Sequence, residues 1–256
     1  MTHVTTNYHT HTPRCKHARG ADREIVQAAI EAGIRVLGIA DHTPYPGVSN
    51  MATGMRMSTE ESADYFASFT ALKEEFADQI ELHIGVEAEY FPDLFDGLLD
   101  HLAQFPCEYM LLGQHFGSGD GAPYFGRPTD DPAVLEQYVS LVVSGIETGR
   151  FLYVAHPDLV PFTGDAALHD AQYRRICEAA KAHNMPLEVN ILGFRQHRAY
   201  PRESFYRIAQ EVGNTLILGA DAHSPAEFTE PDVFDNCRVW AEQFGLPIVE
   251  TLALKK

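Results

Sequence analysis

Short apolar runs rich in β-branched residues alternate with longer helix-period segments along the whole 256-residue chain. Such alternation is typical of repeated βα units around parallel strands. The predicted strands are residues 4–9, 36–42, 81–89, 109–115, 151–156, 187–190 and 215–221. A late run at 246–249 is either an eighth strand or a terminal segment that fastens the C-terminus. Because no linker or low-complexity tract separates the units, the pattern predicts one α/β barrel domain over residues 1–256.

Helix-period segments fill the intervals between the predicted strands. We expect helices at residues 23–32, 58–78, 94–104, 132–148, 171–183 and 204–212. Ser58 and Glu61 have the spacing of a capping box, which predicts the start of the second helix. The longest Gly/Pro-rich stretch, residues 117–131, is expected to form a mobile rim above a pocket.

The charge balance limits the partners of this chain. Its 19 Lys and Arg against 36 Asp and Glu give a net charge of -17, which repels a nucleic-acid polymer. A small phosphorylated substrate is still compatible, because bound divalent cations reverse the local field. No signal-peptide pattern and no run of roughly 18 apolar residues is present, so we expect no membrane partner and a cytoplasmic protein. The sequence leaves the oligomeric state undetermined.

The cysteines contain no C-x-x-C pair and are widely spaced, which indicates neither a disulfide framework nor a thiolate zinc site. We expect all four to be reduced and mostly buried: Cys15, Cys107, Cys177 and Cys237.

Side chains that ligate metals are concentrated where the predicted strands end. Carboxyl ends of parallel barrel strands surround one opening, so residues at those ends converge there. His9 and His11 also share one side of their strand, because side chains alternate. The full set of nine candidate metal ligands is His9, His11, His17, His42, Glu87, His115, His156, Asp221 and His223.

Nine ligands suit two or three divalent cations, at three to four protein ligands each. A set of imidazoles and carboxylates without thiolate favours Zn, Mn or Fe. A lone histidine is more often a hydrogen-bonded or capping residue, but coincidence at six strand ends favours ligation. Glu87 is favoured over Glu89 as the ligand from its strand, and Asp41 is expected to hydrogen-bond a ligand. Solvated or core roles are expected for His3, His83, His101, His169, His183 and His197.

Six ordered motifs carry a resemblance to a known family: His9-Thr10-His11, Ala40-Asp41-His42-Thr43-Pro44, Gly85-Val86-Glu87, Gly113-Gln114-His115, Ala155-His156-Pro157-Asp158 and Gly219-Ala220-Asp221-Ala222-His223. On these motifs the chain resembles the polymerase and histidinol phosphatase (PHP) superfamily over nearly its whole length. The resemblance implies a distorted TIM-like (β/α)7 barrel with a trinuclear site. It also implies three ligand sets: first His9, His11, Glu87 and Asp221, second Glu87, His115 and His156, and third His17, His42 and His223.

Two further segments, Met55-Arg56-Met57-Ser58 and Glu87-Ala88-Glu89-Tyr90-Phe91-Pro92, are similar to the monofunctional histidinol-phosphatase branch. The branch implies hydrolysis of L-histidinol phosphate to L-histidinol and phosphate, in histidine biosynthesis. Arg195 falls where that branch has an arginine that grips the substrate phosphate, and a guanidinium fork matches phosphate oxygens. Residues 159–162 lack the second basic residue that often follows the His-Pro-Asp motif there.

The expected chemistry is attack of a metal-bridged hydroxide on phosphorus, in line with the leaving alkoxide. Asp41, His42 and His223 are the candidate catalytic residues that tune the bound water or protonate the leaving group. Three alternatives stay open: a phosphoesterase acting on another small phosphate or nucleotide, a metal-dependent amidohydrolase, and a non-enzymatic metal-binding module. The amidohydrolase is disfavoured because residues 109–116 contain no lysine that carbamylation would turn into a bridging ligand.

Overall fold

The computed structural model describes residues 4–48, 53–119 and 121–254. Parallel strands form two sheets. The first has the order β1 (Thr6–Asn7), β2 (Val36–His42), β3 (Glu81–Ala88) and β4 (Tyr109–Leu112), and the second has β5 (Leu187–Asn190), β6 (Leu216–Gly219) and β7 (Ile248–Val249). All residues of β2 are buried, because the strand is paired on both sides and has packed side chains on both faces.

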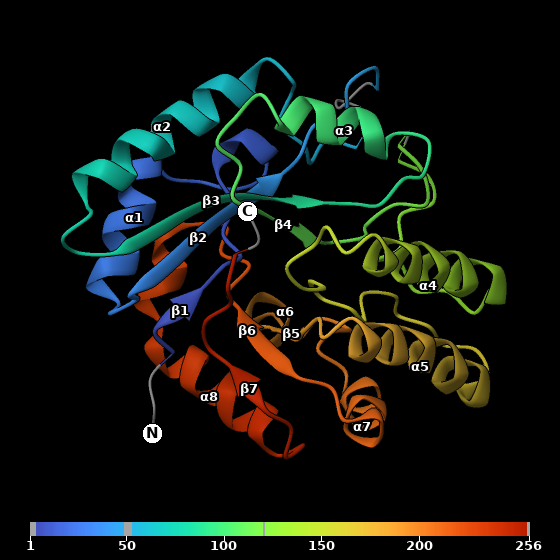
Figure 1. Cartoon of the computed structure of the whole chain (residues 1–256). Helices are drawn as coiled ribbons and strands as arrows, with labels where there is room; N and C mark the ends of the chain where they lie inside the picture. Colours follow the sequence, from blue (N-terminus) through green and yellow to red (C-terminus); the bar gives the residue numbers. More distant parts are fainter. Residues whose placement is uncertain (1–3, 49–52, 120, 255–256) are drawn as a thin grey trace.

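Isolated bridges join the two sheets into a distorted barrel. Val154 pairs in parallel with Leu112 at the edge of the first sheet and with Leu187 at the edge of the second. On the opposite side Thr10 pairs with Ala222, and the His11 N–H donates to the Ala222 carbonyl at 2.8 Å. Figure 1 shows the strands at the centre and the long helices around them. The α/β barrel and the single domain that the sequence predicts are therefore confirmed.

Several predicted strand bounds are wrong. Residues 151–156 form only the bridge at Val154, because the backbone leaves the extended conformation at His156, whose φ is 29°. The first strand is limited to β1, although the chain beyond it stays beside β2 and the Ala222 segment. The late run at 246–249 does contain a strand: β7 pairs with the outer side of β6, with Ile248 opposite Leu216.

Six helices correspond to the six predicted ones: α1 (Asp22–Glu31), α2 (Glu61–Glu75), α3 (Phe95–Leu102), α4 (Pro132–Glu147), α5 (Ala166–Ala182) and α7 (Glu203–Val212). Helix α2 begins later than expected, although Glu61 does accept from the Ser58 N–H at 2.7 Å. Helix α5 begins earlier, because Asp165 caps it by accepting from the Leu168 N–H. Two α-helices among the described residues were not predicted, α6 (Ile191–Arg195) and α8 (Pro231–Glu242). No helix in the described part of the chain is long and apolar enough to cross a bilayer.

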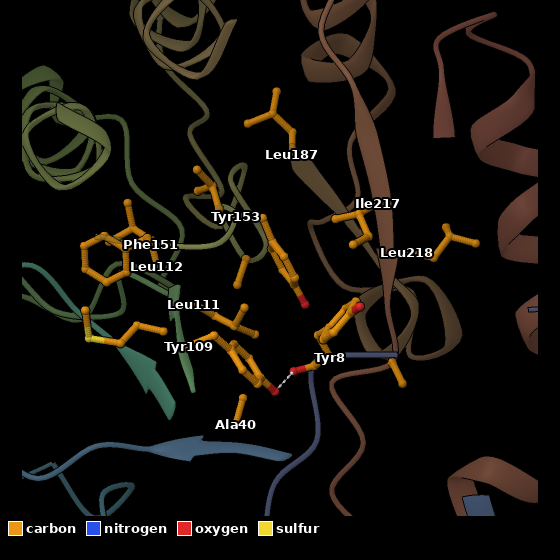
Figure 2. Packing of buried hydrophobic residues seen from close by; sticks show 14 of the residues in the cluster. Tyr8, Ala40, Tyr109, Leu111, Leu112, Phe151, Tyr153, Leu187, Ile217 and Leu218 are labelled. Atoms are coloured by element: carbon orange, nitrogen blue, oxygen red, sulfur yellow. Dashed lines mark hydrogen bonds between the residues drawn. The ribbon is translucent and has the colours of Figure 1, made fainter. Parts of the chain in front are cut away.

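Tyrosine side chains fill the barrel interior. Figure 2 shows Tyr8, Tyr109 and Tyr153 projecting into one space among aliphatic side chains, with the Tyr109 hydroxyl donating to the Tyr8 carbonyl at 2.7 Å. Gly85 leaves room for this packing, since a Cβ there would lie 2.6 Å from the Tyr109 ring. The Tyr153 hydroxyl reaches the carboxylate of Glu188 at 3.3 Å. The interior is thus a packed core that touches the polar cluster at the carboxyl end of the strands.

Candidate metal centre

The barrel brings the nine predicted ligands together at the carboxyl ends of its strands. Five of them form a buried group that we call the inner cluster: His9, His11, Glu87, His156 and Asp221. Each of these side chains belongs to a residue that is at most 4% exposed. The three other histidines with ligand atoms close together form the outer cluster: His17, His42 and His223.

Ring nitrogens and carboxylate oxygens face one another across the inner cluster. His9 Nε2 lies 3.1 Å from His11 Nε2, and His11 Nε2 lies 3.0 Å from Asp221 Oδ1. His156 Nε2 lies 2.8 Å from Glu87 Oε1. Two overlapping ligand groups result, one of His9, His11 and Asp221 and one of His9, Glu87 and His156, each with its ligand atoms within 4.8 Å.

The outer cluster lies nearer the solvent. His17 is exposed and His223 is half-buried, and their Nε2 atoms are 2.9 Å apart. His42 connects the two clusters, because its Nδ1 lies 3.0 Å from Glu87 Oε2 while its ring also belongs to the group with His17 and His223. Glu87 thereby contacts both clusters, as a bridging carboxylate would.

His115 lies beside the inner cluster. Its Nε2 is 3.8 Å from Glu87 Oε1, and its ring meets that of His156 edge-on at 4.7 Å between centroids. Among the described residues, His115 is not part of a three-ligand group that meets the 4.8 Å limit. His115 therefore lies next to Glu87 and His156, the residues with which the family resemblance groups it. Its ring nitrogen is farther from Glu87 than the ring nitrogens of His156 and His42 are.

The hydrogen bonds of the outer histidines fix which ring nitrogen is free. His17 Nδ1 lies 2.9 Å from the Cys15 carbonyl and His223 Nδ1 lies 2.8 Å from the Asp221 carbonyl. A carbonyl only accepts, so each Nδ1 carries the proton and each Nε2 presents a lone pair. Two lone pairs facing each other at 2.9 Å repel unless a cation lies between or beside them. The outer cluster therefore has the chemistry of a cation site.

Glu87 gives the inner cluster the chemistry of a cation site as well. Its Oε2 is buried, and no contact to it from the described residues has hydrogen-bond geometry, although ring nitrogens of His42, His9 and His11 lie 3.0, 3.5 and 3.5 Å away. A buried carboxylate oxygen without a hydrogen bond is costly, and a divalent cation is the partner that these imidazole nitrogens would share with it. Imidazole and carboxylate ligands together suit Zn, Mn or Fe.

Carboxylates behind the inner histidines orient their rings. His9 Nδ1 lies 2.8 Å from Glu188 Oε1, and His11 Nδ1 lies 3.3 Å from Asp41 Oδ1. Such contacts hold the Nδ1 proton and direct Nε2 toward a metal, and they raise the basicity of the ligand. Asp41 makes the contact that the sequence analysis expected of it. Glu188 was missed; the available signal is an acidic residue inside the fully buried strand β5.

Glu188 joins three parts of the cluster. Besides the His9 ring, its carboxylate accepts from the His156 backbone N–H at 2.8 Å and from Asn190 Nδ2 at 2.9 Å. The same Asn190 amide donates to Asp221 Oδ2 at 3.1 Å. His156 and Asp221 both have positive φ, so these bonds help to hold two unusual backbone conformations.

Glycines opposite the two buried glutamates make the arrangement possible. A Cβ on Gly113 would lie 1.8 Å from Glu87 Oε1, and a Cβ on Gly219 would lie 1.8 Å from Glu188 Oε1. No other residue fits at either position without moving the carboxylate. The glycines of these two strand-end segments therefore preserve the space for Glu87 and Glu188.

Glu89 has a different role from Glu87. One oxygen accepts from the backbone N–H groups of His115 and Phe116, at 3.2 and 3.0 Å, and the other pairs with Arg56. Arg56 also donates to the Gly119 carbonyl at 3.1 Å. This buried ion pair fastens the loop after β4 to the segment around Arg56, so it supports the wall of the site rather than a cation.

Without metal, the histidines and carboxylates of the two clusters shift one another's pKa values. Burial opposes the charged forms of all these groups. The carboxylates of Glu188, Asp221 and Glu87 nevertheless raise the pKa of His9 to about 10, and neighbouring imidazoles hold the pKa values of Glu87 and Asp221 well below the usual range. Burial lowers the pKa of His223 to about 3. The inner cluster thus retains a proton that an incoming cation must displace.

A cavity of about 500 Å³ opens above the clusters. Outer-cluster histidines lie in its wall together with Tyr124 of the loop predicted as a rim, and two guanidinium groups, those of Arg19 and Arg198, also line it. Arg195, the predicted phosphate ligand, is not in this lining; it pairs with Glu227, and its Nη1 lies 3.6 Å from Glu230. Arg19 and Arg198 were not predicted from the sequence, although Arg198 follows closely after Arg195, the last residue of α6.

A parallel α/β barrel that gathers imidazoles and carboxylates beneath a cavity at its carboxyl-terminal mouth defines a class of metal-dependent hydrolases. The family model described as the PHP domain matches residues 7–191. The chain therefore belongs to the PHP domain family.

Curated relatives extend this result. A protein of Deinococcus radiodurans described as a probable histidinol-phosphatase is 30% identical over 228 residues, covering 86% of each chain. The histidinol-phosphatase of Bacillus subtilis is 24% identical over 252 residues, covering 86% of this chain and 93% of the relative. Both relatives are described as phosphatases.

A solved structure confirms the fold. The histidinol phosphate phosphatase of Lactococcus lactis, in complex with zinc, L-histidinol and phosphate, matches 99% of both chains with a TM-score of 0.73 at 18% identity. The barrel described above is thus shared with that enzyme over its full length.

Proposed function

We propose that this chain is a metal-dependent phosphomonoesterase that hydrolyses L-histidinol phosphate to L-histidinol and phosphate. The observation that carries the proposal is the convergence of nine ligand-type side chains beneath one cavity, in a PHP chain whose curated relatives include histidinol-phosphatases. The functional domain extends over residues 1–256. Asp221 and His223, which lie beyond the family-model match, contribute to both clusters.

Two or three divalent cations, Zn, Mn or Fe, are the proposed cofactors. The inner ligands are His9, His11, Glu87, His156 and Asp221, with His115 beside them, and the outer ligands are His17, His42 and His223. When bound, such cations activate water and neutralise the phosphate oxygens.

The protein's own groups position the substrate and the protons. Arg19 and Arg198 line the cavity and supply guanidinium forks for a phosphate, while Arg195 stays a candidate that would have to leave Glu227. Asp41 accepts from the Thr12 N–H at 3.3 Å and keeps the His11 Nδ1 proton in place. His42 and His223, both in the cavity wall, are the proposed groups for proton transfer to the leaving alkoxide.

A small phosphorylated molecule is the proposed partner, rather than a nucleic acid or a membrane. The cavity volume of about 500 Å³ matches a metabolite-sized ligand. The net charge of -17 opposes nucleic-acid polymers. A cytoplasmic location belongs to the same proposal, supported by four cysteines that are all free thiols.

The test compares turnover on L-histidinol phosphate with that on other small phosphomonoesters, amides and lactones, after reconstitution with Zn, Mn or Fe. We expect the highest kcat/KM on histidinol phosphate, and loss of metal and turnover together in His9→Ala. His183→Ala, at the exposed end of α5, is the matched histidine control. Preference for another phosphate would refute the substrate, and normal turnover in His9→Ala would refute the metal-dependent mechanism.

A further inference from the structure

Cys15 is buried beside the outer cluster. Its exposed fraction is 0%, and its Sγ lies within 4.8 Å of ring nitrogens of both His11 and His223. From the sequence we expected four reduced, mostly buried cysteines and found no indication of a thiolate zinc site. The structure instead places one thiol among the candidate ligands.

Local backbone structure aims this thiol at the cluster. A single-turn 3₁₀ helix, Pro13–Cys15, follows His11 and is capped by the Thr12 side chain, which accepts from the Arg14 N–H at 3.3 Å. Thr12 is held in turn by Asp41. Lys16 then adopts the left-handed conformation with φ 73°, which reverses the chain. One short segment thereby delivers the side chains of His11, Cys15 and His17 to the same site.

The surroundings of Cys15 favour a sulfur that accepts. The backbone N–H of Ala18 donates to Cys15 Sγ at 3.3 Å. By contrast, the Cys107 thiol donates to the Tyr109 carbonyl at 3.4 Å. Within the described part of the chain, Cys15 is the cysteine whose sulfur lies close enough to two histidines to form a ligand group. Its position resembles that of a ligand more than that of a packing residue.

We propose that Cys15 is a sulfur ligand of the outer cation, acting together with His223 and its neighbours. A thiolate in the ligand set favours borderline-soft cations, so the outer position selects Zn²⁺ over Mn²⁺. On binding, the thiol loses its proton to solvent and the sulfur donates a lone pair to the cation. The inference rests on the metal-binding part of the proposed function and is independent of the substrate.

Cobalt substitution tests the sulfur ligand directly. The metal-depleted full chain is titrated with Co²⁺ while its near-ultraviolet absorption is recorded. We expect a thiolate-to-cobalt charge-transfer band that Cys15→Ser abolishes and the control Cys107→Ser retains. Competition between Zn²⁺ and Mn²⁺ for the outer position should also shift away from zinc in Cys15→Ser.

A complementary variant avoids reliance on the folding of Cys15→Ser. Replacing the other three cysteines by alanine leaves Cys15 as the sole thiol, and the band must persist there at wild-type intensity. Cobalt that binds to the wild-type protein without this band would overturn the proposal, as would unchanged metal selectivity in Cys15→Ser. Phosphatase activity would be untouched by that result, so failure of the sulfur ligand is distinguishable from failure of the proposed function.

Discussion

The inner and outer clusters both contain histidine rings, but these rings are supported differently. Carboxylates support two of the three inner rings: Glu188 contacts His9 Nδ1 and Asp41 contacts His11 Nδ1. Backbone carbonyls support two of the three outer rings, by accepting from His17 Nδ1 and from His223 Nδ1. A carboxylate makes an imidazole a stronger ligand than a neutral carbonyl does.

Burial strengthens this contrast. The inner residues are almost inaccessible to solvent, whereas His17 is exposed and His223 is half-buried. Inner cations are therefore expected to bind tightly and to exchange slowly. A cation held by the outer cluster would be expected to exchange more readily, because His17, His42 and His223 line the cavity. The difference suggests a division of labour between a permanent inner centre and an adjustable outer position.

The largest expected effect comes from removing the link between the clusters. Glu87→Gln deletes the charge that lies among the inner ligands and contacts His42 of the outer cluster. Inner and outer cations should be lost together. Turnover should fall by more than the roughly 10–100-fold that is typical when a residue hydrogen-bonded to a metal ligand is replaced. Elemental analysis of metal per chain and phosphate release measure both quantities. Glu81→Gln, on the exposed start of the same strand, is the control, and a normal metal content in Glu87→Gln would contradict the bridging role.

A smaller loss of metal and activity is expected from a variant that affects only the outer cluster. His17→Ala removes a ligand of the outer group alone, so we expect the loss of one cation per chain with the inner metal retained. Turnover should fall in proportion to outer-site occupancy, and added Zn²⁺ should restore part of it. Stoichiometry from elemental analysis before and after dialysis provides the readout. Simultaneous loss of every cation in His17→Ala would show that the two clusters are not separable.

Glu188→Gln weakens the inner cluster without removing a proposed ligand. The amide keeps the size of the side chain but loses the charge that supports the His9 ring, so inner-site affinity should fall about 10–100-fold. A chelator competition measures the change, and Asp41→Asn gives the parallel measurement for His11. Outer-site affinity should stay within error. An equal loss at both sites would show that Glu188 acts on the fold as a whole.

The sequence was sufficient to predict the site residues that lie at the carboxyl ends of strands. His42, for example, closes a fully buried strand, and parallel pairing then places it beside Glu87 of the next strand. The barrel class follows from the same regularity. Residues 151–156 were assigned wrongly because their apolar composition suits a strand, while the turn at His156 depends on bonds to Glu188 from a distant segment.

Residues missed from the sequence share one property: their roles depend on tertiary contacts. Glu188 lies 179 positions from His9, and no local pattern indicates that pair. Nothing in the local sequence distinguishes Arg19 and Arg198 from ordinary surface arginines. They line the cavity only because of how the loops fold. Helix α8 was not predicted, although it buries Phe234, Cys237 and Ala241.

The smallest expected difference between the clusters is in their pH dependence. Burial lowers the pKa of His9, but the surrounding carboxylates outweigh it and raise the pKa to about 10, so the metal-free inner cluster carries a proton at neutral pH. His223, with its pKa lowered to about 3 mainly by burial, is already neutral there.

A cation must displace the His9 proton, so inner-site affinity should rise with pH by roughly tenfold per unit for each proton released, up to the pKa of that group. The outer site should show a shallower slope, because His223 is already neutral above about pH 3 and one proton, from the Cys15 thiol, is released there, whereas the pKa values of both His9 and His11 are raised in the inner cluster. Chelator competitions at several pH values in wild-type and His17→Ala protein measure the two slopes. As pH falls, inner-site affinity should weaken faster, even though the inner site binds more tightly at neutral pH. Identical slopes would mean that the carboxylates around His9 do not hold a proton in the metal-free protein, and the electrostatic contrast between the clusters would then fail.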